Sequence, residues 1–495
     1  MTRTASPMSL PAGFLETARA LIRADTSPGR GTRAAAGLLA PLYQAAGLPV
    51  RRQEDEPGEI NLLAGPGGAG TGATDLSRVA GAGGALLVTH LDTVPAGPPD
   101  RWTETGGDPW ALTARDGTLF GLGCADVKLD ALCKVEAARR LRGRKLARPF
   151  WLLGTCGEEV GLRGARRFAA SALFQEIQPR FVLCGEPSEL QLITAHKGYA
   201  VVRCTVTDSK ARVVSSAGPG VERLAFAGKA AHSSTPHLGK NAIRSALAWA
   251  RSAGTPLLSA AGGTSANVVP ASCVLEVPAP RDSGDPAPDE VRFLPAAPPR
   301  PNLWRAVMTA GALEDLWLGL LRDLPPREDA RFDPPGAVGG LNVLESEGEA
   351  AAGEVYGRAA AHATLDARLL PEHDPDALLR AFEDKAQEWV RGLGGGELSL
   401  RVEVTRNAGG MSLDGGAELV ASIGRVLSRS GLDPTPHAKP TSTEAGVFAR
   451  RGCQAVVIGP GRSTGNAHTP NERIETAQLE RAIEVYEQIL LELCS

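Results

Sequence analysis

Two residues that could bind a metal ion follow closely on the apolar run at residues 85–88. They are His90 and Asp92. If this run is a strand, residues two apart point to the same side, so one side chain could bind the metal while the other holds it in place. A metal-bound imidazole commonly donates its second ring N–H to a carboxylate, which fixes the orientation of the ring. The pair alone is weak evidence, because short motifs of this kind often arise by chance.

More potential ligands follow apolar runs or turns further along the chain. The runs at residues 150–153, 181–184 and 455–458 are interpreted as buried strands, and residues 127–141 as a helix. In open α/β sheets the reactive groups gather beyond the carboxyl ends of the strands, so side chains at these places could converge. One such acidic residue is usually a helix cap or a loop residue, but the ordered set favours a metal site. The potential ligands are Asp126, Glu158, Glu159, Glu186 and His468.

The types of these ligands predict the kind of metal site. Imidazoles and carboxylates without thiolates suit a catalytic zinc, cobalt or manganese site better than a closed structural zinc site. Two ions roughly 3.5–4 Å apart that share one carboxylate, for which we choose Asp126, would each have three protein ligands and room for water. One of Glu158 and Glu159 then remains free to take a proton from that water and deliver it to a leaving amine.

The motifs, in this order, resemble those of the acetylornithine deacetylase and succinyl-diaminopimelate desuccinylase family of co-catalytic zinc metallopeptidases, to which aminoacylases, carboxypeptidase G-type enzymes and several dipeptidases are related. They are His90-Leu91-Asp92, Gly123-Cys124-Ala125-Asp126-Val127-Lys128, Glu158-Glu159, Gly185-Glu186-Pro187-Ser188 and Ala467-His468-Thr469-Pro470. The resemblance implies that His90, Asp126 and Glu186 bind one metal ion. It implies that Asp126, Glu159 and His468 bind the other. Glu158 would be the general acid/base, and Asp92 would orient His90.

A second region, residues 228–243, is similar to the lid and dimerisation domain of that family. The resemblance implies that His232 polarises the scissile carbonyl oxygen, usually in the partner subunit's site, and that the chain is a homodimer. Stabilising charge on that oxygen is a large catalytic effect. Asn267 and Arg368 match segments that contact substrate, and Arg368 could bind a carboxylate through two parallel hydrogen bonds. The structural alternatives are a turn residue for His232 and a surface ion pair for Arg368.

The expected fold class is α/β. A catalytic domain with a mixed central sheet flanked by helices takes residues 1–196 and 408–495, and an inserted α+β lid domain takes residues 197–407. In the lid we expect strands at residues 199–206, 223–227, 273–277, 363–369 and 398–404, and helices at 241–252 and 375–390. In the catalytic domain we expect a helical pair at residues 14–46 and a closing helix at 476–493.

Residues 278–356 form a Pro-, Ala- and Gly-rich insertion larger than the lid of typical relatives contains. Apolar residues at helical spacing predict a packed helix over residues 304–321, with loops on both sides. The insertion could decorate the lid or contact another subunit. Alternatively, it could cover the active site and select a larger or apolar acyl group.

The composition indicates a cytoplasmic enzyme with a small-molecule substrate. The chain has 495 residues and a net charge of −3, so it offers no basic field for nucleic acid or an anionic membrane. We see neither a secretory signal nor an apolar run long enough to span a bilayer. Eight cysteines without a Cys-x-x-Cys pair are interpreted as buried thiols. The glycine pattern at residues 65–70 matches a dinucleotide fingerprint formally, but no helix is expected after it, so we interpret it as a loop.

These observations predict a metal-dependent hydrolase that cleaves an amide bond of an N-acyl amino acid or a small peptide. The metal ions would activate the attacking water, and Glu158 would move the proton. A dipeptidase or carboxypeptidase of the same family is the alternative. Two further alternatives are a serine hydrolase using Ser463, within a formal nucleophile-elbow match at residues 461–465, and a non-catalytic binding homologue. Leu122, Leu129 and the turn at residues 441–445 depart from the family pattern and leave the substrate open.

Overall fold

The computed structural model describes residues 9–66, 83–214, 220–279, 288–295, 298–394 and 396–495. Most of the glycine-rich segment with the dinucleotide-like pattern, and part of the insertion at 278–356, lie outside these ranges. The chain divides into two compact units. The first unit comprises Met1–His196, Met411–Lys439 and Thr443–Ser495, and the second comprises Lys197–Gly410 and Pro440–Ser442. Among the helices described, none is long and apolar enough to cross a bilayer.

The first unit is built on a mixed sheet whose centre consists of parallel strands. The strand order is β1-β2-β6-β3-β7-β20-β8-β18, and β19 also pairs with β8. Strand β3 is parallel to both β6 and β7, and β20 is parallel to β7. These central strands are short, apolar and buried, as the sequence predicts. They are β3 (Ala85–His90), β6 (Phe150–Thr155), β7 (Phe181–Cys184) and β20 (Gln454–Val457).

The remaining strands of this sheet lie on its two sides. The hairpin of β1 (Val50–Glu56) and β2 (Glu59–Ala64) adds to β6 in the antiparallel direction. On the other side, β8 (Leu192–His196) pairs antiparallel with β20 and with β18 (Met411–Ser412), and parallel with β19 (Pro436–Lys439). The mixed sheet predicted from the sequence is therefore confirmed.

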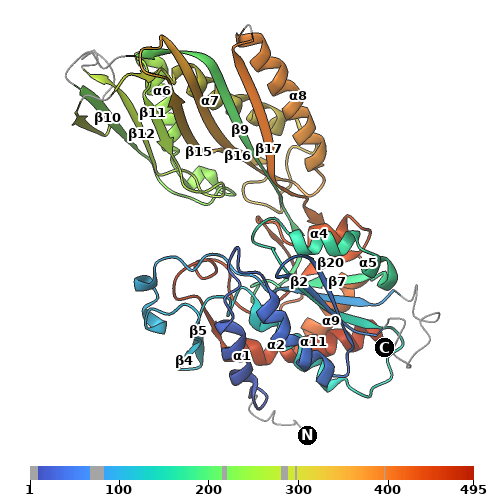
Figure 1. The fold of residues 1–495 in the computed structure, drawn as a ribbon. Helices are drawn as coiled ribbons and strands as arrows, with labels where there is room; N and C mark the ends of the chain where they lie inside the picture. Colours follow the sequence, from blue (N-terminus) through green and yellow to red (C-terminus); the bar gives the residue numbers. More distant parts are fainter. Residues whose placement is uncertain (1–8, 67–82, 215–219, 280–287, 296–297, 395) are drawn as a thin grey trace. The chain divides into compact units, whose positions relative to one another are not determined.

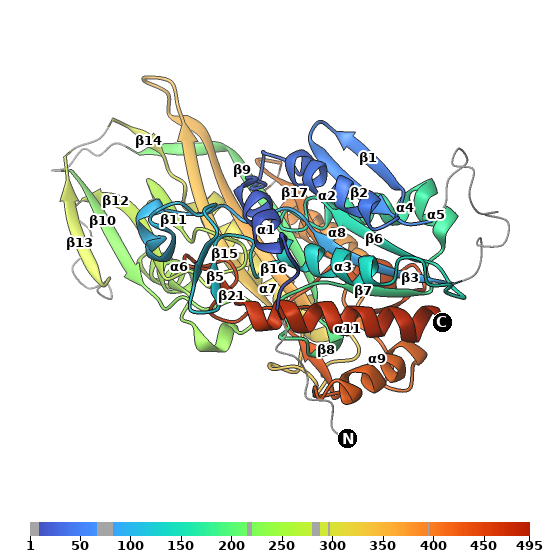
Figure 2. The ribbon, with the colours of Figure 1, turned by 90° about the horizontal axis from the view of Figure 1, so that it is seen from below.

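Helices cover both faces of this sheet. Side chains alternate along β3, so Ala85 and Leu87 join the apolar cluster of one face while Leu86 and Val88 point to the other. Figure 2 shows α11 running beside α3 and α9 on the first face. The helices of this face are α1 (Phe14–Arg23), α2 (Arg33–Ala45), α3 (Lys128–Arg140), α9 (Glu418–Arg429) and α11 (Thr476–Cys494). On the other face, α10 (Ala445–Ala449) packs against β7, β18 and β20, and α4 (Arg163–Ala170) packs against β2 and α10. Helix α5 (Ala172–Ile177) packs against α4.

A small antiparallel sheet lies beside the main one in the first unit. It consists of β4 (Thr113–Arg115), β5 (Thr118–Phe120) and β21 (Arg473–Glu475), in the order β21-β5-β4. The short helices η2 (Pro99–Arg101) and η3 (Thr103–Thr105) precede it. Because β21 pairs with β5, this sheet holds the segment that contains His468 next to the segment that leads into Asp126.

The second unit is an antiparallel sheet covered by helices (Figure 1). The strand order is β13-β10-β12-β11-β15-β16-β9-β14, and β17 also pairs with β9. The long strands are β9 (Gly198–Val214), β10 (Gly220–Ala227), β12 (Ser272–Ala279), β15 (Val338–Glu349), β16 (Tyr356–Leu369) and β17 (Leu398–Ala408). The short ones are β11 (Ser259–Gly262), β13 (Glu290–Leu294) and β14 (Arg300–Pro301).

Three helices pack side by side on this sheet. They are α6 (Ala242–Ala253), α7 (Trp304–Asp323) and α8 (Pro375–Gly394), and η4 (Pro236–Leu238) precedes them. Asn241 caps α6, accepting hydrogen bonds from the backbone N–H groups of Ile243 and Arg244. Trp317 of α7 packs edge-on against Phe382 of α8, with ring centres 4.9 Å apart. The predicted helix over residues 304–321 is therefore α7, and it belongs to the core of the unit.

The prediction of loops on both sides of that helix is wrong. Strand β15 follows α7 and lies inside the sheet between β11 and β16, and β13 and β14 precede α7. The alternating pattern of β15 is broken by a register shift between Leu341 and Val343, which places Leu341 and Leu344 in the core three residues apart. That bulge, together with Gly339 and Gly340, interrupts the alternation of apolar and polar residues by which a strand is predicted from the sequence.

Candidate metal centre

The expected metal ligands of the first unit follow the parallel strands at their carboxyl ends. His90 is the last residue of β3, and Glu158 and Glu159 follow β6. Glu186 comes two residues after β7. Because β3, β6 and β7 are parallel neighbours, their carboxyl ends meet at one edge, and these side chains gather there. The loop after β20 contributes His468.

Asp126 lies between two imidazoles. Its Oδ1 is 3.1 Å from His90 Nε2, and its Oδ2 is 3.2 Å from His468 Nε2. Nε2 of His468 also lies 3.0 Å from Oε1 of Glu159. His468 adopts a backbone φ of 61°, in the left-handed region that residues other than glycine seldom enter. The carboxylate chosen from the sequence as the shared ligand thus contacts both histidines, one oxygen to each.

Two overlapping groups have ligand atoms close enough to surround a cation. In the first, the ligand atoms of His90, Glu158 and Glu159 all lie within 4.8 Å of one another. In the second, those of Asp126, Glu159 and His468 do so. Imidazole nitrogens and carboxylate oxygens of this kind suit zinc, cobalt or manganese, so the side chains fit the two divalent ions expected from the sequence. The second group matches the predicted set completely.

The carboxylate of Asp92 binds the backbone of Glu158 and Glu159, in addition to lying near His90. Its Oδ1 accepts a hydrogen bond from the backbone N–H of Glu158 at 3.0 Å, and its Oδ2 accepts one from that of Glu159 at 3.1 Å. The group nearest to His90 Nδ1 is the backbone carbonyl oxygen of Asp92, at 3.0 Å, while the Asp92 carboxylate is 3.8 Å away. The residue predicted to orient His90 therefore does so mainly through its main chain, and its side chain holds the turn after β6.

Glu186 has a cationic partner that sequence reasoning missed. Its Oε2 lies 3.1 Å from Nζ of Lys439, the last residue of β19. Both side chains are largely buried. Glu186 belongs to neither of the two close groups described above, although it follows the expected strand. Lys439 ends a polar segment, so no apolar run in the sequence marks it as a site residue.

The charges of the cluster shift the pKa values of its members. Burial alone would lower the pKa of His468, but the negative charge of Glu159 and the contacts with Asp126 raise it to about 12. Burial also lowers the pKa of His90, but the hydrogen bond and the negative charge of Asp126 raise it above its ordinary value. Although burial favours the neutral form of Asp126, hydrogen bonds from both imidazoles hold its pKa well below the usual value. These shifts share one cause, the negative charge that the carboxylates concentrate around the two imidazoles, which is the charge that a divalent cation would neutralise.

Glu472 is a second residue that sequence reasoning missed. It is 1 % exposed, and its Oε1 accepts hydrogen bonds from the backbone N–H groups of Ala125 at 2.8 Å and Asp126 at 2.9 Å. Burial, together with the charge of Asp126, raises its pKa to about 8. Its place four residues after His468 is the only sequence signal for it. Glu472 holds the backbone that presents Asp126 to the two histidines.

Glu444 brings a further acidic group close to the centre. It is 3 % exposed, and its Oε2 accepts a hydrogen bond from Oγ1 of Thr155, the last residue of β6, at 3.0 Å. Burial raises its pKa to about 8, although the nearby His90 acts in the opposite direction. The other carboxyl oxygen, Oε1, is buried without a hydrogen-bond partner among the described residues. Glu444 lies in the turn at residues 441–445.

The loop after β20 does not form a nucleophile elbow. Ser463 lies in that loop, and the next helix, α11, begins only at Thr476, after β21. A nucleophile elbow requires a helix directly after the serine. The structure gives the serine-hydrolase alternative no support.

His232 of the second unit is exposed and held by its own turn. The backbone N–H of Ser234 donates to His232 Nδ1 at 3.2 Å, and Oγ of Ser234 lies 2.7 Å from the same nitrogen. A nitrogen that accepts the backbone hydrogen bond carries no proton, so the neutral ring carries its proton on Nε2. In this form His232 can donate a hydrogen bond from Nε2 to an oxygen.

The structure brings the other two expected lid residues to the same turn. The backbone N–H of Ser233 donates to the carbonyl oxygen of Asn267 at 2.9 Å, and Nη2 of Arg368 donates to Ser233 Oγ at 3.1 Å. The Arg368 guanidinium lies 3.5 Å from the centre of the Tyr199 ring. With 3 % of its surface exposed, Arg368 is not the surface ion pair considered as an alternative. Contact of Asn267 or Arg368 with a substrate stays a prediction.

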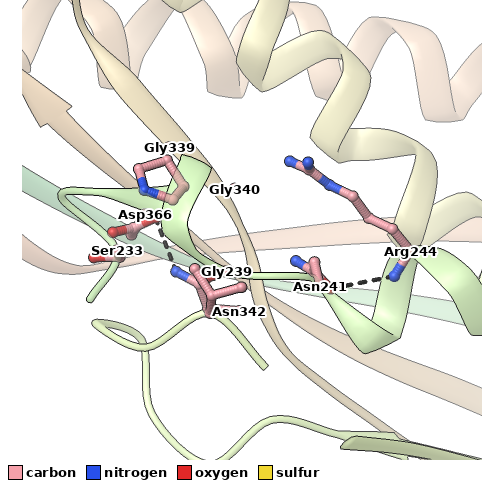
Figure 3. A pocket seen from close by; sticks show the side chains of 10 residues that line it. Ser233, Gly239, Asn241, Arg244, Gly339, Gly340, Asn342 and Asp366 are labelled. Carbon is pink, nitrogen blue, oxygen red and sulfur yellow. Dashed lines mark hydrogen bonds between the residues drawn. The ribbon is translucent and has the colours of Figure 1, made fainter. Parts of the chain in front are cut away.

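A polar pocket opens beside this turn, within the second unit. Figure 3 shows the Asn342 amide directed at the Asp366 carboxylate, with Ser233 beside them. Asn342 Nδ2 donates to Asp366 Oδ1 at 2.9 Å, and burial raises the pKa of Asp366 to about 7. The pocket is lined by Ser233, Pro236, Gly239, Asn241, Arg244, Val269, Gly339, Gly340, Asn342 and Asp366. Three of these residues, from Gly339 to Asn342, come from β15, so the insertion contributes to the surroundings of Ser233.

Comparison with curated proteins finds similarity to acetylornithine deacetylases along part of the chain. The sequence is 36 % identical over 244 residues to an acetylornithine deacetylase from Vibrio vulnificus (strain CMCP6), covering 48 % of this chain and 53 % of the relative. It is also 36 % identical over 244 residues to an acetylornithine deacetylase from Yersinia pestis, covering 48 % of this chain and 54 % of the relative. The chain spans about half the length of the curated relatives it matches.

Solved structures share the fold along nearly the whole chain. An aminoacylhistidine dipeptidase from Vibrio alginolyticus has a TM-score of 0.61 at 16 % identity, with 99 % of both chains covered. A metallo-carboxypeptidase of the M20 family from Sulfolobus solfataricus has a TM-score of 0.58 at 19 % identity, with 97 % of this chain and 98 % of that chain covered. At such identities these likenesses establish the fold alone.

A family model decides the assignment. The model described as peptidase family M20/M25/M40 matches residues 86–492, which is most of the sequence and spans every candidate ligand from His90 to His468. The chain therefore belongs to peptidase family M20/M25/M40.

Proposed function

We propose that this protein is a metal-dependent amidohydrolase that removes the acyl group from an N-acyl amino acid. One observation carries the proposal: the Asp126 carboxylate reaches His90 with one oxygen and His468 with the other, beside Glu158 and Glu159. His90, Asp126 and Glu186 would hold one divalent ion, and Asp126, Glu159 and His468 the other. Zinc is the metal we propose, with cobalt and manganese as alternatives.

When bound, the two ions would supply Lewis acidity, lowering the pKa of water and polarising the amide carbonyl. The residues of the chain do the rest. Glu158, held by the Asp92 carboxylate through its backbone N–H, takes the proton of the attacking water and delivers it to the leaving amine. Glu472 keeps the backbone at Asp126 in place.

The second unit would supply the remaining groups. We assign it the role of lid and dimerisation domain, with residues 197–407 as the inserted domain and a homodimer as the active form. In its Nε2–H form, His232 would donate a hydrogen bond to the oxygen on which negative charge develops. Asn267 and Arg368, which contact the same Ser233 turn, would orient the substrate carboxylate.

Relatives support two substrate classes. The curated relatives are named acetylornithine deacetylases, which favours an N-acetyl or similar acyl group on an amino acid. The structural neighbours include a dipeptidase and a carboxypeptidase, which makes hydrolysis of small peptides the second candidate. One neighbour from Bacillus subtilis is described as a dinuclear metal binding peptidase, which supports the two-ion proposal. All eight cysteines are free thiols, and we propose a cytoplasmic location.

A hydrolysis screen with defined metals tests this function. The protein is freed of metal, reloaded with Zn²⁺, Co²⁺ or Mn²⁺, and assayed on N-acetyl, N-succinyl and long-chain N-acyl amino acids and on dipeptides. We expect metal-dependent release of a free amine, with N-acyl amino acids preferred. Glu158→Gln, loaded with the same metal, is the matched control. Preference for dipeptides would select the second candidate, and no metal-dependent hydrolysis of any member would refute the proposal.

A further inference from the structure

Lys439 is a buried cation inside the candidate metal centre. Its side chain is 16 % exposed, and its Nζ lies 3.1 Å from Glu186 Oε2, which is within hydrogen-bond distance. Lys439 is the last residue of β19, which pairs with β8, so its backbone is anchored in the sheet. A charge that is buried in this way is costly unless acidic groups surround it.

The acidic groups around Lys439 are members of the metal centre. The residues that act on it are Glu186, Asp126 and Glu158. A lysine side chain is ordinarily an ammonium group at neutral pH, and this one lies 3.1 Å from a carboxylate oxygen of Glu186. It therefore faces the same negative charge that a divalent ion would use.

This placement affects the two expected metal groups unequally. Glu186 is assigned to the group with His90 and Asp126, and its carboxylate is shared with the ammonium. The acidic ligand of the other group, Glu159, contacts the imidazole of His468 at 3.0 Å, and a ligating imidazole is neutral. A cation that binds at His90, Asp126 and Glu186 must share Glu186 with a fixed positive charge and is repelled by it.

We propose that Lys439 is a positioning residue that holds Glu186 and, as a competing cation, weakens divalent-ion binding at His90, Asp126 and Glu186 relative to binding at Asp126, Glu159 and His468. This inference rests on the proposed function, since it presumes two metal ions. The inference attributes the difference in affinity between the two metal sites to the charge of Lys439, so a substitution that removes this charge tests it.

The experiment is a titration of the metal-free full-length protein with Zn²⁺ against a chromophoric chelator. The wild type is expected to bind two ions with different dissociation constants, and Glu186→Gln identifies the weaker site because it weakens that site further. Lys439→Met, which keeps the length of the side chain and removes its charge, should tighten the weaker site by about tenfold, within the range by which partners of metal ligands change affinity. Lys439→Arg, the matched control, should keep the difference.

The outcomes separate this inference from the proposed function. If Lys439→Met leaves both dissociation constants unchanged, or weakens the first site, Lys439 is not a competing cation and the inference is wrong, although the proposed function stands. If the wild type binds no Zn²⁺, the proposed function itself is wrong. Should Lys439→Met fail to fold, as judged by circular dichroism, Lys439→Gln provides the same comparison with a polar side chain.

Discussion

The Asp92 carboxylate accepts a hydrogen bond from the backbone N–H of Glu158 at 3.0 Å, and so connects the end of β3 to the turn after β6. The same carboxylate accepts a second bond from Glu159, while the imidazole of His90 faces the main-chain carbonyl oxygen of Asp92. The Asp92 side chain therefore holds the backbone of Glu158, the proposed general acid/base, more directly than it sets the tautomer of His90.

Asp92→Ala should lower turnover by about 10–100-fold, the usual effect of losing a partner of the metal ligands, and should retain most of the metal. The backbone carbonyl that faces His90 remains in this variant, whereas the acceptor for the Glu158 and Glu159 backbone is lost. Steady-state kinetics and metal analysis measure the two effects separately. Loss of metal with turnover per bound ion unchanged would mean that Asp92 acts through the imidazole instead.

Glu158→Gln should retain both metal ions and lose turnover by about 10²–10⁴-fold, the range for removal of a general acid/base. The glutamine has nearly the same shape and leaves the backbone bond to Asp92 intact, so a structural effect is not expected. Metal content of the purified variant and its rate on the best substrate check the prediction. A rate near that of the wild type would exclude Glu158 as the proton carrier.

His468→Ala should lose one of the two metal ions, because His468 contacts both Asp126 and Glu159 in the second group. Elemental analysis after dialysis measures the number of ions bound per chain. Ser463→Ala, a change in the same loop, is the control and should keep both ions and full activity. Loss of activity in Ser463→Ala together with normal metal content would bring the serine-hydrolase alternative back.

Glu472→Ala should destabilise the protein, because the backbone N–H groups of Ala125 and Asp126 would then be buried without an acceptor. Each such group costs about 1–3 kcal/mol in the free energy of unfolding. Urea unfolding of the metal-free protein measures this cost. Glu475→Ala, at an exposed position three residues further on, at the end of β21, should change the free energy by less than about 0.5 kcal/mol. Equal effects of the two substitutions would contradict the role of Glu472.

Glu444 should make the stability of the metal-free protein fall as the pH rises from about 4.5 to about 8. Its pKa is raised from 4.5 in the unfolded chain to about 8 by burial, so in this range the folded state holds a proton that the unfolded state has lost. This single group contributes a slope of up to about 1.4 kcal/mol per pH unit. The contribution is complete below pH 4.5 and is lost as the pH passes 8.

Glu444→Gln tests that slope, because the amide does not titrate. The free energies of unfolding of the wild type and the variant are measured at pH 5 and pH 8 in the presence of a chelator. The stability of the variant relative to that of the wild type should be higher at pH 8 than at pH 5. A difference that is independent of pH would show that the Glu444 carboxyl has an ordinary pKa.

The sequence by itself determined the family, the order of the expected ligands and the elements that precede them. Short apolar runs at residues 85–88, 150–153, 181–184 and 455–458 are parallel strands, because a segment buried on both faces must be apolar along its whole length. Parallel strands place their carboxyl ends together, so the position of each ligand just after its run already implied the convergence. The helix predicted over residues 476–493 is α11, since its apolar spacing is regular over several turns.

Only the tertiary structure decided which groups support those ligands. Glu472 reaches the backbone of Asp126 because β21 pairs with β5, and the ammonium of Lys439 reaches Glu186 from β19. Strand β15 enters the sheet of the second unit despite a bulge that breaks its alternation. Local periodicity reports which face of one element is buried, whereas these contacts join residues more than 200 positions apart or depend on a register that no single segment specifies.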